Sequence, residues 1–152
     1  MSVTAPDIST LKQAALNWLS RRDYSEAQLK TRLQRIGGEP APVQQVLDWC
    51  KAQNYLNQQR FVQMLLRSRA NKGYGLAYII QECRQQQISR QQVLDCASEL
   101  ELDWFALARQ QYLKKYGLSA VTDYKDKVKR MAYLQRRGFS SEQIEFAINQ
   151  TE

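Results

Sequence analysis

A series of short amphipathic segments, each with the start and stop signals of an α-helix, constrains the fold of this chain more than any other feature. Apolar residues recur at spacings of three and four, so that Leu11, Ala15 and Trp18 share one face of a run that begins at Thr10. Only three prolines and six glycines interrupt the 152 residues, and no segment reads as a convincing strand. The pattern predicts an all-α fold of about nine short helices.

Helix boundaries are marked by local signals. Gly37 and Gly38 end one helix, and Pro40 and Pro42 begin the next in the favoured first turn. Residue pairs with the spacing of a capping box mark four helix starts: Thr10 with Gln13, Ser25 with Gln28, Ser89 with Gln92, and Ser140 with Gln143.

Three four-residue segments align without gaps, at Arg22–Ser25, Lys72–Gly75 and Arg137–Ser140. Each has a basic helix end, then Gly or Asp, an aromatic residue, a capping position and apolar residues at fixed offsets. The distances between the copies are irregular, but the recurrence indicates one helical unit used three times. The sequence therefore predicts a flexible segment at 1–9 and three tandem three-helix repeats at 10–56, 57–101 and 102–152, in an elongated, curved body.

Composition indicates the kind of partner and the cellular compartment to expect. Lys and Arg number 22 against 15 Asp and Glu, a net charge of +7, which favours an acidic partner, although solubility alone also explains it. Residues 1–10 lack the apolar core of a signal peptide, and no apolar run is long enough to span a membrane. The three cysteines form no CxxC pair, which favours a reducing compartment. We expect a soluble, cytoplasmic monomer without a membrane partner.

The sequence lacks the residues and motifs that most catalytic sites require. The absence of histidine removes imidazole acid–base catalysis, nucleophile–histidine pairs and most zinc sites. Gly73-Tyr74-Gly75 is a lone GxG that reads as a turn between helices, and Glu99, Glu101 and Asp103 read as a solvated turn. We therefore expect no enzyme activity, no metal and no cofactor.

Basic residues in the second half of the chain are the candidates for partner or DNA binding. They suit a cationic surface for DNA phosphates or an acidic protein groove, although those at helix ends also favour the helix dipole. Lys125, Lys129 and Arg136 share one stripe of a helix, and the first two, lying mid-helix, favour function. The candidates are Arg67, Arg69, Lys72, Lys114, Lys115, Lys125, Lys127, Lys129, Arg130, Arg136 and Arg137.

Apolar and aromatic residues are assigned mainly to the core. In the helix expected at about Asp123 to Arg137, the inward residues are predicted to be Tyr124, Val128, Met131 and Leu134. Core packing is favoured over base stacking for a further set: Trp18, Trp49, Trp104, Tyr55, Tyr74 and Phe139.

The chain from about Trp18 to Ile148 resembles the RecX family. The resemblance is carried in order along the sequence by these stretches: Arg21–Glu26 with Leu29 and Leu33, Asp48–Cys50, Tyr55-Leu56, Arg67–Gly75, Asp103-Trp104, Lys115–Gly117 and Arg137–Phe139. One departure is Asn57-Gln58-Gln59, which stands where the family usually has acidic residues.

The resemblance implies tandem three-helix repeats and a role in DNA repair, recombination and the SOS response. It implies binding to the RecA recombinase and to its filament on single-stranded DNA, in the filament groove. Such a protein limits filament growth and lowers ATP hydrolysis, strand exchange and coprotease activity. The alternative that the residues leave open is a helical module that binds DNA directly through a basic face, in which case binding weakens steeply with salt.

Overall fold

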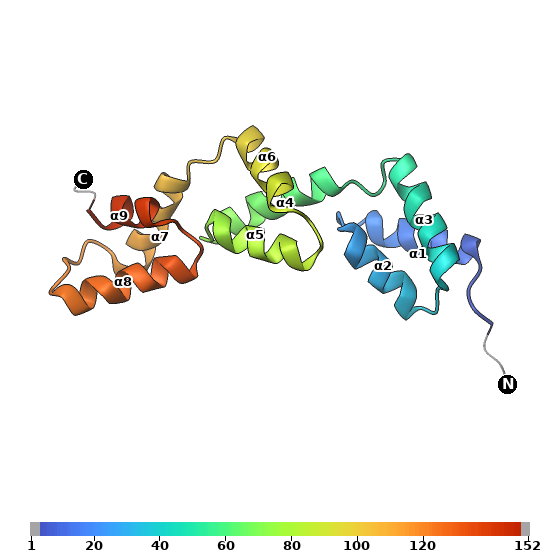
Figure 1. Ribbon diagram of the computed structural model, residues 1–152, viewed down its shortest axis with the longest axis horizontal. Coiled ribbons are helices and arrows are strands. Elements are labelled where there is room, and N and C mark those ends of the chain that lie inside the picture. The colour runs from blue at the N-terminus through green and yellow to red at the C-terminus, as the bar shows by residue number, and fades with distance from the viewer. Residues whose placement is uncertain (1–3, 150–152) are drawn as a thin grey trace. The chain divides into compact units, whose positions relative to one another are not determined.

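The structure is a computed structural model that describes residues 4–149, and all of its regular structure is helical (Figure 1). Within that range there is no strand, which confirms the predicted all-α fold. The nine helices described are α1 (Ile8–Leu19), α2 (Glu26–Arg35), α3 (Pro40–Ala52), α4 (Gln58–Asn71), α5 (Leu76–Gln85), α6 (Arg90–Leu100), α7 (Trp104–Tyr116), α8 (Tyr124–Arg136) and α9 (Ser141–Asn149).

Most of the predicted helix starts are confirmed. Ser25 and Ser89 form complete capping boxes with the glutamines three residues on, and Ser140 exchanges the same two hydrogen bonds with Gln143. The side chains of Asn57 and Asp103 cap α4 and α7 by accepting from the backbone N–H groups three residues on.

The first helix start was predicted at the wrong residue. Helix α1 begins at Ile8, and Asp7 is its cap, because the Asp7 carboxylate accepts from the backbone N–H of Thr10 at 2.8 Å. Ile8 also packs against the adjacent core, so the expected flexible segment at 1–9 is helical at its end. Residues 1–3 of that segment, and 150–152 of the third repeat, lie outside the described residues.

One type of turn recurs at the same place in each group of three helices. Gly37, Gln87 and Gly138 adopt positive φ angles of 99°, 62° and 101°, and the next residue's N–H bonds to the carbonyl five residues back. These turns join α2 to α3, α5 to α6 and α8 to α9. By its position the segment Arg137–Ser140 is a second turn, whereas Arg22–Ser25 and Lys72–Gly75 are first turns. This offset explains the irregular spacing of the three aligned segments. The α4–α5 turn shares the geometry, since Gly73 has a φ angle of 88° and the Tyr74 N–H donates to the Arg69 carbonyl.

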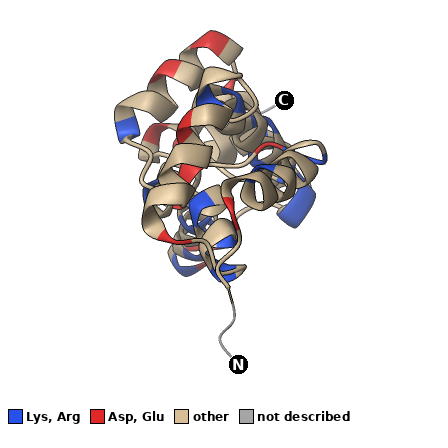
Figure 2. Ribbon diagram, turned by 90° about the vertical axis from the view of Figure 1, so that its right-hand side faces the viewer, with Lys and Arg blue, Asp and Glu red and all other residues tan. Residues whose placement is uncertain are grey.

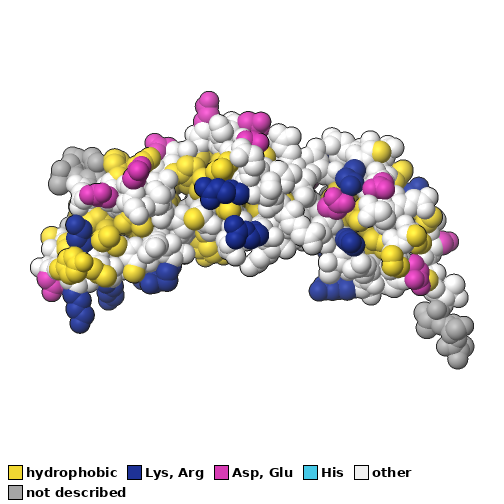
Figure 3. Space-filling view, in the orientation of Figure 1, with side chains coloured by type: hydrophobic (Ala, Val, Ile, Leu, Met, Phe, Trp, Pro, Cys, Tyr) yellow, Lys and Arg dark blue, Asp and Glu magenta, His cyan; other side chains and the backbone are white. Residues whose placement is uncertain are grey.

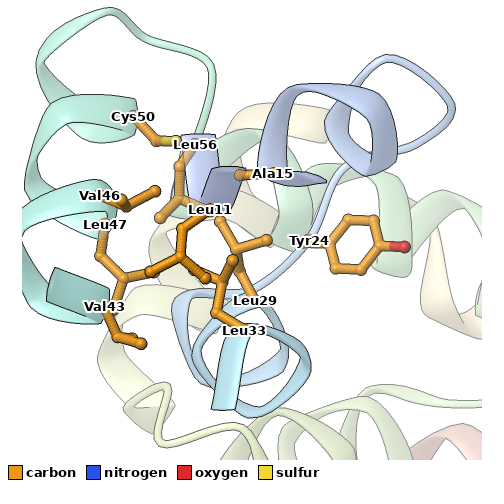
Figure 4. Packing of buried hydrophobic residues seen from close by; sticks show 10 residues of the cluster. All are labelled: Leu11, Ala15, Tyr24, Leu29, Leu33, Val43, Val46, Leu47, Cys50 and Leu56. Atoms are coloured by element: carbon orange, nitrogen blue, oxygen red, sulfur yellow. The ribbon is translucent and has the colours of Figure 1, made fainter. Parts of the chain in front are cut away.

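The chain divides into two compact units, Met1–Met64 and Leu65–Glu152, with the division inside α4. In the first unit, side chains from α1, α2 and α3 converge on one core (Figure 4). Tyr24, the aromatic residue before the α2 cap, is buried as part of that core. The cluster consists of Leu11, Ala15, Tyr24, Leu29, Leu33, Val43, Val46, Leu47, Cys50 and Leu56.

The second unit contains a core among α7, α8 and α9, and α5 packs on α6. The α7–α9 core is built from Ala108, Tyr112, Leu134, Phe139, Ile144 and Ala147. Cys83 and Cys96 are buried free thiols in this unit, as Cys50 is in the first, so all three act as small buried apolar residues. The expected elongated, curved arrangement of the repeats stays a prediction.

Candidate partner-binding surface

Basic and acidic residues are interspersed along the helices (Figure 2), so the question is which basic side chains are accessible to a partner. Among the sequence-predicted candidates, Arg130 is not. Only 4% of Arg130 is exposed, and its guanidinium donates to the Tyr112 hydroxyl at 2.7 Å and to the Ser119 carbonyl at 2.8 Å. It also pairs with Asp126 at 3.1 Å. Arg130 is therefore a structural residue that holds the segment before α8 against α7, which corrects the prediction of a surface contact.

The side chain of Arg69 is engaged by an intramolecular ion pair. Its guanidinium forms two hydrogen bonds with the Glu82 carboxylate on α5, Nε to Oε1 at 2.8 Å and Nη2 to Oε2 at 2.6 Å. The pairing with Glu82 raises the pKa of Arg69 further. Because a two-pronged ion pair satisfies both the charge and the donors, Arg69 has little capacity left for a phosphate.

Arg137 joins two turns of the second unit. Its Nε donates to the Gly73 carbonyl at 3.1 Å and its Nη2 to the Lys72 carbonyl at 2.5 Å, and the guanidinium stacks on the Tyr74 ring at 4.0 Å. In return the backbone N–H of Gly75 donates to the Arg137 carbonyl at 2.7 Å. Arg137 thus acts as a link inside the protein, and this too corrects its placement among the surface candidates.

The remaining candidates are exposed. Helix α8 brings together the largest group, because successive turns of one helix carry four of the cations. Lys114 and Lys115 lie on the last turn of α7, while Arg67 and Lys72 lie on and just after α4. The exposed cations of α8 are Lys125, Lys127, Lys129 and Arg136.

The apolar residues of α8 are not where the sequence pattern placed them. Tyr124 is 81% exposed, Val128 43% and Met131 41%, and of the four residues predicted inward only Leu134 is buried. The helix is rotated because its inward stripe is formed by Arg130 and Leu134, four residues apart. Apolar periodicity could not reveal this, since it counts a charged residue as outward-facing. The usable signal was the Asp126–Arg130 pair at helical spacing.

A groove of about 420 Å³ lies between the exposed apolar face of α8 and helix α9. From α8 it is lined by Tyr124, Val128 and Met131, and from α9 by Ile144 and Ile148. Figure 3 shows hydrophobic side chains exposed over this region, with basic side chains along α8 and acidic side chains over α9. Sequence reasoning did not predict the groove, because it assigned Tyr124, Val128 and Met131 of α8 to the core.

The other sequence motifs of the described chain offer no second site. Tyr74 stacks on Tyr78 at 4.0 Å between ring centroids, and Phe139 is buried as predicted. Gly73-Tyr74-Gly75 forms the turn between α4 and α5, which confirms its interpretation as a helix–helix turn. Residues 4–149 contain no cluster of three or more Cys, Asp or Glu side chains that could hold a metal ion, and none of the helices described is long and apolar enough to cross a membrane.

The fold and the surface together define a class: an all-helical repeat protein whose accessible features are a basic helix face and an apolar groove. Three family models match in order, described as the first, second and third three-helix domains of RecX, over residues 12–50, 57–94 and 101–148. The chain therefore belongs to the RecX family, a family of regulatory proteins rather than enzymes.

Individual relatives agree with this assignment. Regulatory protein RecX of Escherichia coli (strain SE11) is 35% identical over 150 residues, which cover 92% of this chain and 90% of that protein. The protein of the same name from Salmonella typhi is 34% identical with the same coverage.

Solved structures show the same fold. RecX from Lactobacillus salivarius aligns with a TM-score of 0.75 at 19% identity, covering 93% of this chain and 94% of that chain. A second crystal structure, of regulatory protein RecX, aligns with a TM-score of 0.76 at 20% identity, covering 99% and 81%. The prediction of RecX membership is confirmed, and with it the all-α fold of three three-helix domains.

Proposed function

We propose that this chain is a negative regulator of the RecA recombinase, which binds RecA and its filament on single-stranded DNA in the bacterial cytoplasm. The observation that carries the proposal is the ordered match of all three RecX domains, together with 34–35% identity to regulatory proteins RecX over 92% of the chain. In this proposal the monomer lodges in the filament groove and limits filament growth. It thereby lowers ATP hydrolysis, strand exchange and coprotease activity.

The exposed cations of the second unit suit such a groove. A filament on DNA presents phosphates and acidic side chains, and complementary charge speeds association and fixes orientation. Lys125, Lys127, Lys129 and Arg136 on α8 are the exposed cations best placed to act together, with Lys114 and Lys115 at the end of α7. We propose these six for the contact, and exclude Arg69, Arg130 and Arg137 because their guanidinium groups are held by intramolecular partners.

Asn57-Gln58-Gln59, which stand where the RecX family usually has acidic residues, are compatible with this function, because two of the three have structural roles. Asn57 caps α4, and Gln58 accepts from the backbone N–H of Glu26 at 3.1 Å. We propose that the repeats span 10–56, 57–101 and 102–152, with the change at 57–59 at the start of the second.

A second candidate function is direct DNA binding through the basic face of α8. The observation that favours it is the group of four exposed cations within α8, since the one acidic residue of that helix, Asp126, is paired with Arg130. In this case any effect on a recombinase would be competition for DNA.

Titration of RecA-dependent ATP hydrolysis distinguishes the two. The assay uses RecA on single-stranded DNA in large excess, so that simple competition for DNA is removed. A filament regulator inhibits hydrolysis at concentrations well below that of RecA. Inhibition only when the DNA itself is saturated would contradict the proposal and favour direct DNA binding.

A further inference from the structure

Two exposed arginines of the first unit are held by aromatic rings and not by carboxylates. The central guanidinium carbon (Cζ) of Arg22 lies 3.9 Å from the centroid of the Tyr24 ring. That of Arg32 lies 4.5 Å from the Trp18 ring and 5.5 Å from the Tyr24 ring, and its Nη1 donates to the Tyr24 hydroxyl. Figure 4 shows that hydroxyl directed away from the other core side chains. The rings therefore hold both guanidinium groups in place at the surface.

The acidic residues nearest in the sequence do not neutralise this pair of arginines. Each is engaged by another cation, Asp23 by Arg60 at 2.6 Å and Glu26 by Lys51 at 3.0 Å. In the part of the chain that the structure describes, no ion pair involves Arg22 or Arg32. Stacking on a ring orients a guanidinium group without using the N–H donors in its plane. Those donors are therefore available to a ligand.

The ligand that suits this pair is an oxyanion with repeated charges. A guanidinium edge binds phosphate or carboxylate oxygens through two parallel N–H donors. One carboxylate is satisfied by one such edge, whereas Arg22 and Arg32 present two edges beside the same ring. Two further exposed arginines lie next to Arg22 and one turn beyond Arg32, at Arg21 and Arg35. A nucleic acid backbone carries a phosphate at every nucleotide, so successive phosphates can meet successive arginines.

We propose that Arg22 and Arg32 form a phosphate-binding site for the backbone of a nucleic acid strand. The site lies in the first unit, whereas every cation proposed above for contact with the filament lies in the second. It concerns the bare strand, so it can fail while the regulation of RecA holds, and the reverse. It is also separate from the basic face of α8, and substitutions distinguish the two.

Binding of a fluorescein-labelled oligothymidylate, followed by fluorescence anisotropy, tests the site without RecA. The affinity of the natural chain should fall as salt is raised from about 50 to 200 mM, because phosphate contacts release counterions. Arg22→Gln together with Arg32→Gln should weaken binding at least about tenfold at the lower salt concentration, and should reduce the slope of log affinity against log salt by about 1. Circular dichroism of the variant checks that the helices persist.

Two matched substitutions separate the arginines from charge in general. Lys30 is exposed on the same helix as Arg32 but lies about 200° around it. Lys30→Gln should therefore weaken binding far less than Arg32→Gln does. Arg22→Lys together with Arg32→Lys keeps both charges and removes the planar edges, so it should keep the salt slope and bind several-fold more weakly than the natural chain.

Four outcomes would overturn the proposal. The first is a natural chain that does not bind the oligothymidylate, and the second is a folded Arg22→Gln, Arg32→Gln variant with unchanged affinity and salt slope. The third is loss of binding only in Lys125→Gln with Lys129→Gln, which would place the strand on α8. The fourth is an oligoglutamate of equal length bound as tightly as the oligothymidylate, because the pair would then take an acidic protein segment. If the glutamine variant does not fold, the lysine variant decides, since affinity equal to that of the natural chain would exclude the guanidinium edges.

Discussion

The guanidinium of Arg137 donates a hydrogen bond to the carbonyl oxygen of Gly73, at 3.1 Å, across 64 positions of sequence. This bond belongs to a contact between the α4–α5 turn and the α8–α9 turn, in which Gly75 and Ala77 donate back to the carbonyls of Arg137 and Gly138. The second and third groups of helices are thus joined through backbone groups at two glycine-containing turns. Such a joint leaves no room for side chains at the points of closest approach.

Replacing Gly75 by serine tests that joint. Gly75 is the cap of α5 without a side-chain hydrogen bond, so by local capping alone serine would stabilise the helix by a few tenths of a kcal/mol. A β-carbon there would lie 2.4 Å from the Gly138 carbonyl oxygen, which is backbone and cannot rotate away. We expect a net loss of about 1–3 kcal/mol in urea unfolding followed by circular dichroism. A stability gain in Gly75→Ser would show that the two turns are not held in contact.

Arg130 should be far less tolerant of substitution than its neighbour Lys129. Replacement by glutamine leaves the Tyr112 hydroxyl and the Ser119 carbonyl without their donor and Asp126 without its counterion. The thermal midpoint of Arg130→Gln should fall by about 5 °C or more, whereas that of Lys129→Gln should stay within about 2 °C. Equal midpoints would mean that the arginine is not buried, and would return it to the surface candidates.

The helix starts and the rotation of α8 show which parts of the fold could be predicted from the sequence. Helix starts at Ser25, Ser89 and Ser140 depend on residues three positions apart, so local reasoning finds them. The rotation of α8 depends on whether Arg130 finds acceptors on α7 and in the segment after it, and the i,i+4 spacing of Asp126 and Arg130 is the one local signal that bears on it. Its apolar stripe was accordingly assigned to the core.

The candidate surface was recovered in part for the same reason. Charge counting finds every basic residue but cannot tell that Arg69 meets Glu82, or that Arg137 meets Gly73, because both contacts depend on tertiary packing. Lys125, Lys127 and Lys129 remain exposed because α8 turns its other side to the core. The equivalence of the three second turns was recognisable only from backbone geometry, since Gln87 takes the positive φ angle that Gly37 and Gly138 take in the other two.

Acid should weaken the anchoring of the segment before α8. The backbone N–H of Thr122 and, secondarily, Arg130 lower the pKa of Asp126. Because the pKa of Asp126 is lower in the folded chain than in the unfolded chain, the ionised carboxylate stabilises the fold at pH values above the unfolded-state pKa of about 3.9. That stabilisation is lost as the pH falls through the lower folded-state pKa. The midpoint of Asp126→Asn should therefore lie below that of the natural chain at pH 7. The two midpoints should converge as the pH falls through the lowered folded-state pKa of Asp126. A gap between them that stays constant as the pH is lowered from 7 into the acid range would contradict the assignment.

The three cysteines should be unreactive in the folded protein. Burial raises the pKa of Cys83 to about 11, and burial likewise raises the pKa of Cys50 and of Cys96. Because the thiolate is the reactive form, labelling by a disulfide reagent at pH 8 should be negligible without denaturant and complete in urea. Rapid labelling of one thiol in native buffer would show that its helix opens readily.

The central claim is that the chain recognises the RecA filament and not merely its DNA, and the salt dependence of binding tests it most directly. A labelled chain is titrated with a single-stranded oligonucleotide, bare or coated with RecA, between about 50 and 200 mM salt, a range over which phosphate contacts alone lose orders of magnitude in affinity. We predict that binding to the coated oligonucleotide persists at salt concentrations that abolish binding to the bare one. Equal affinity and equal salt dependence on both would contradict the claim and leave a DNA-binding module in its place.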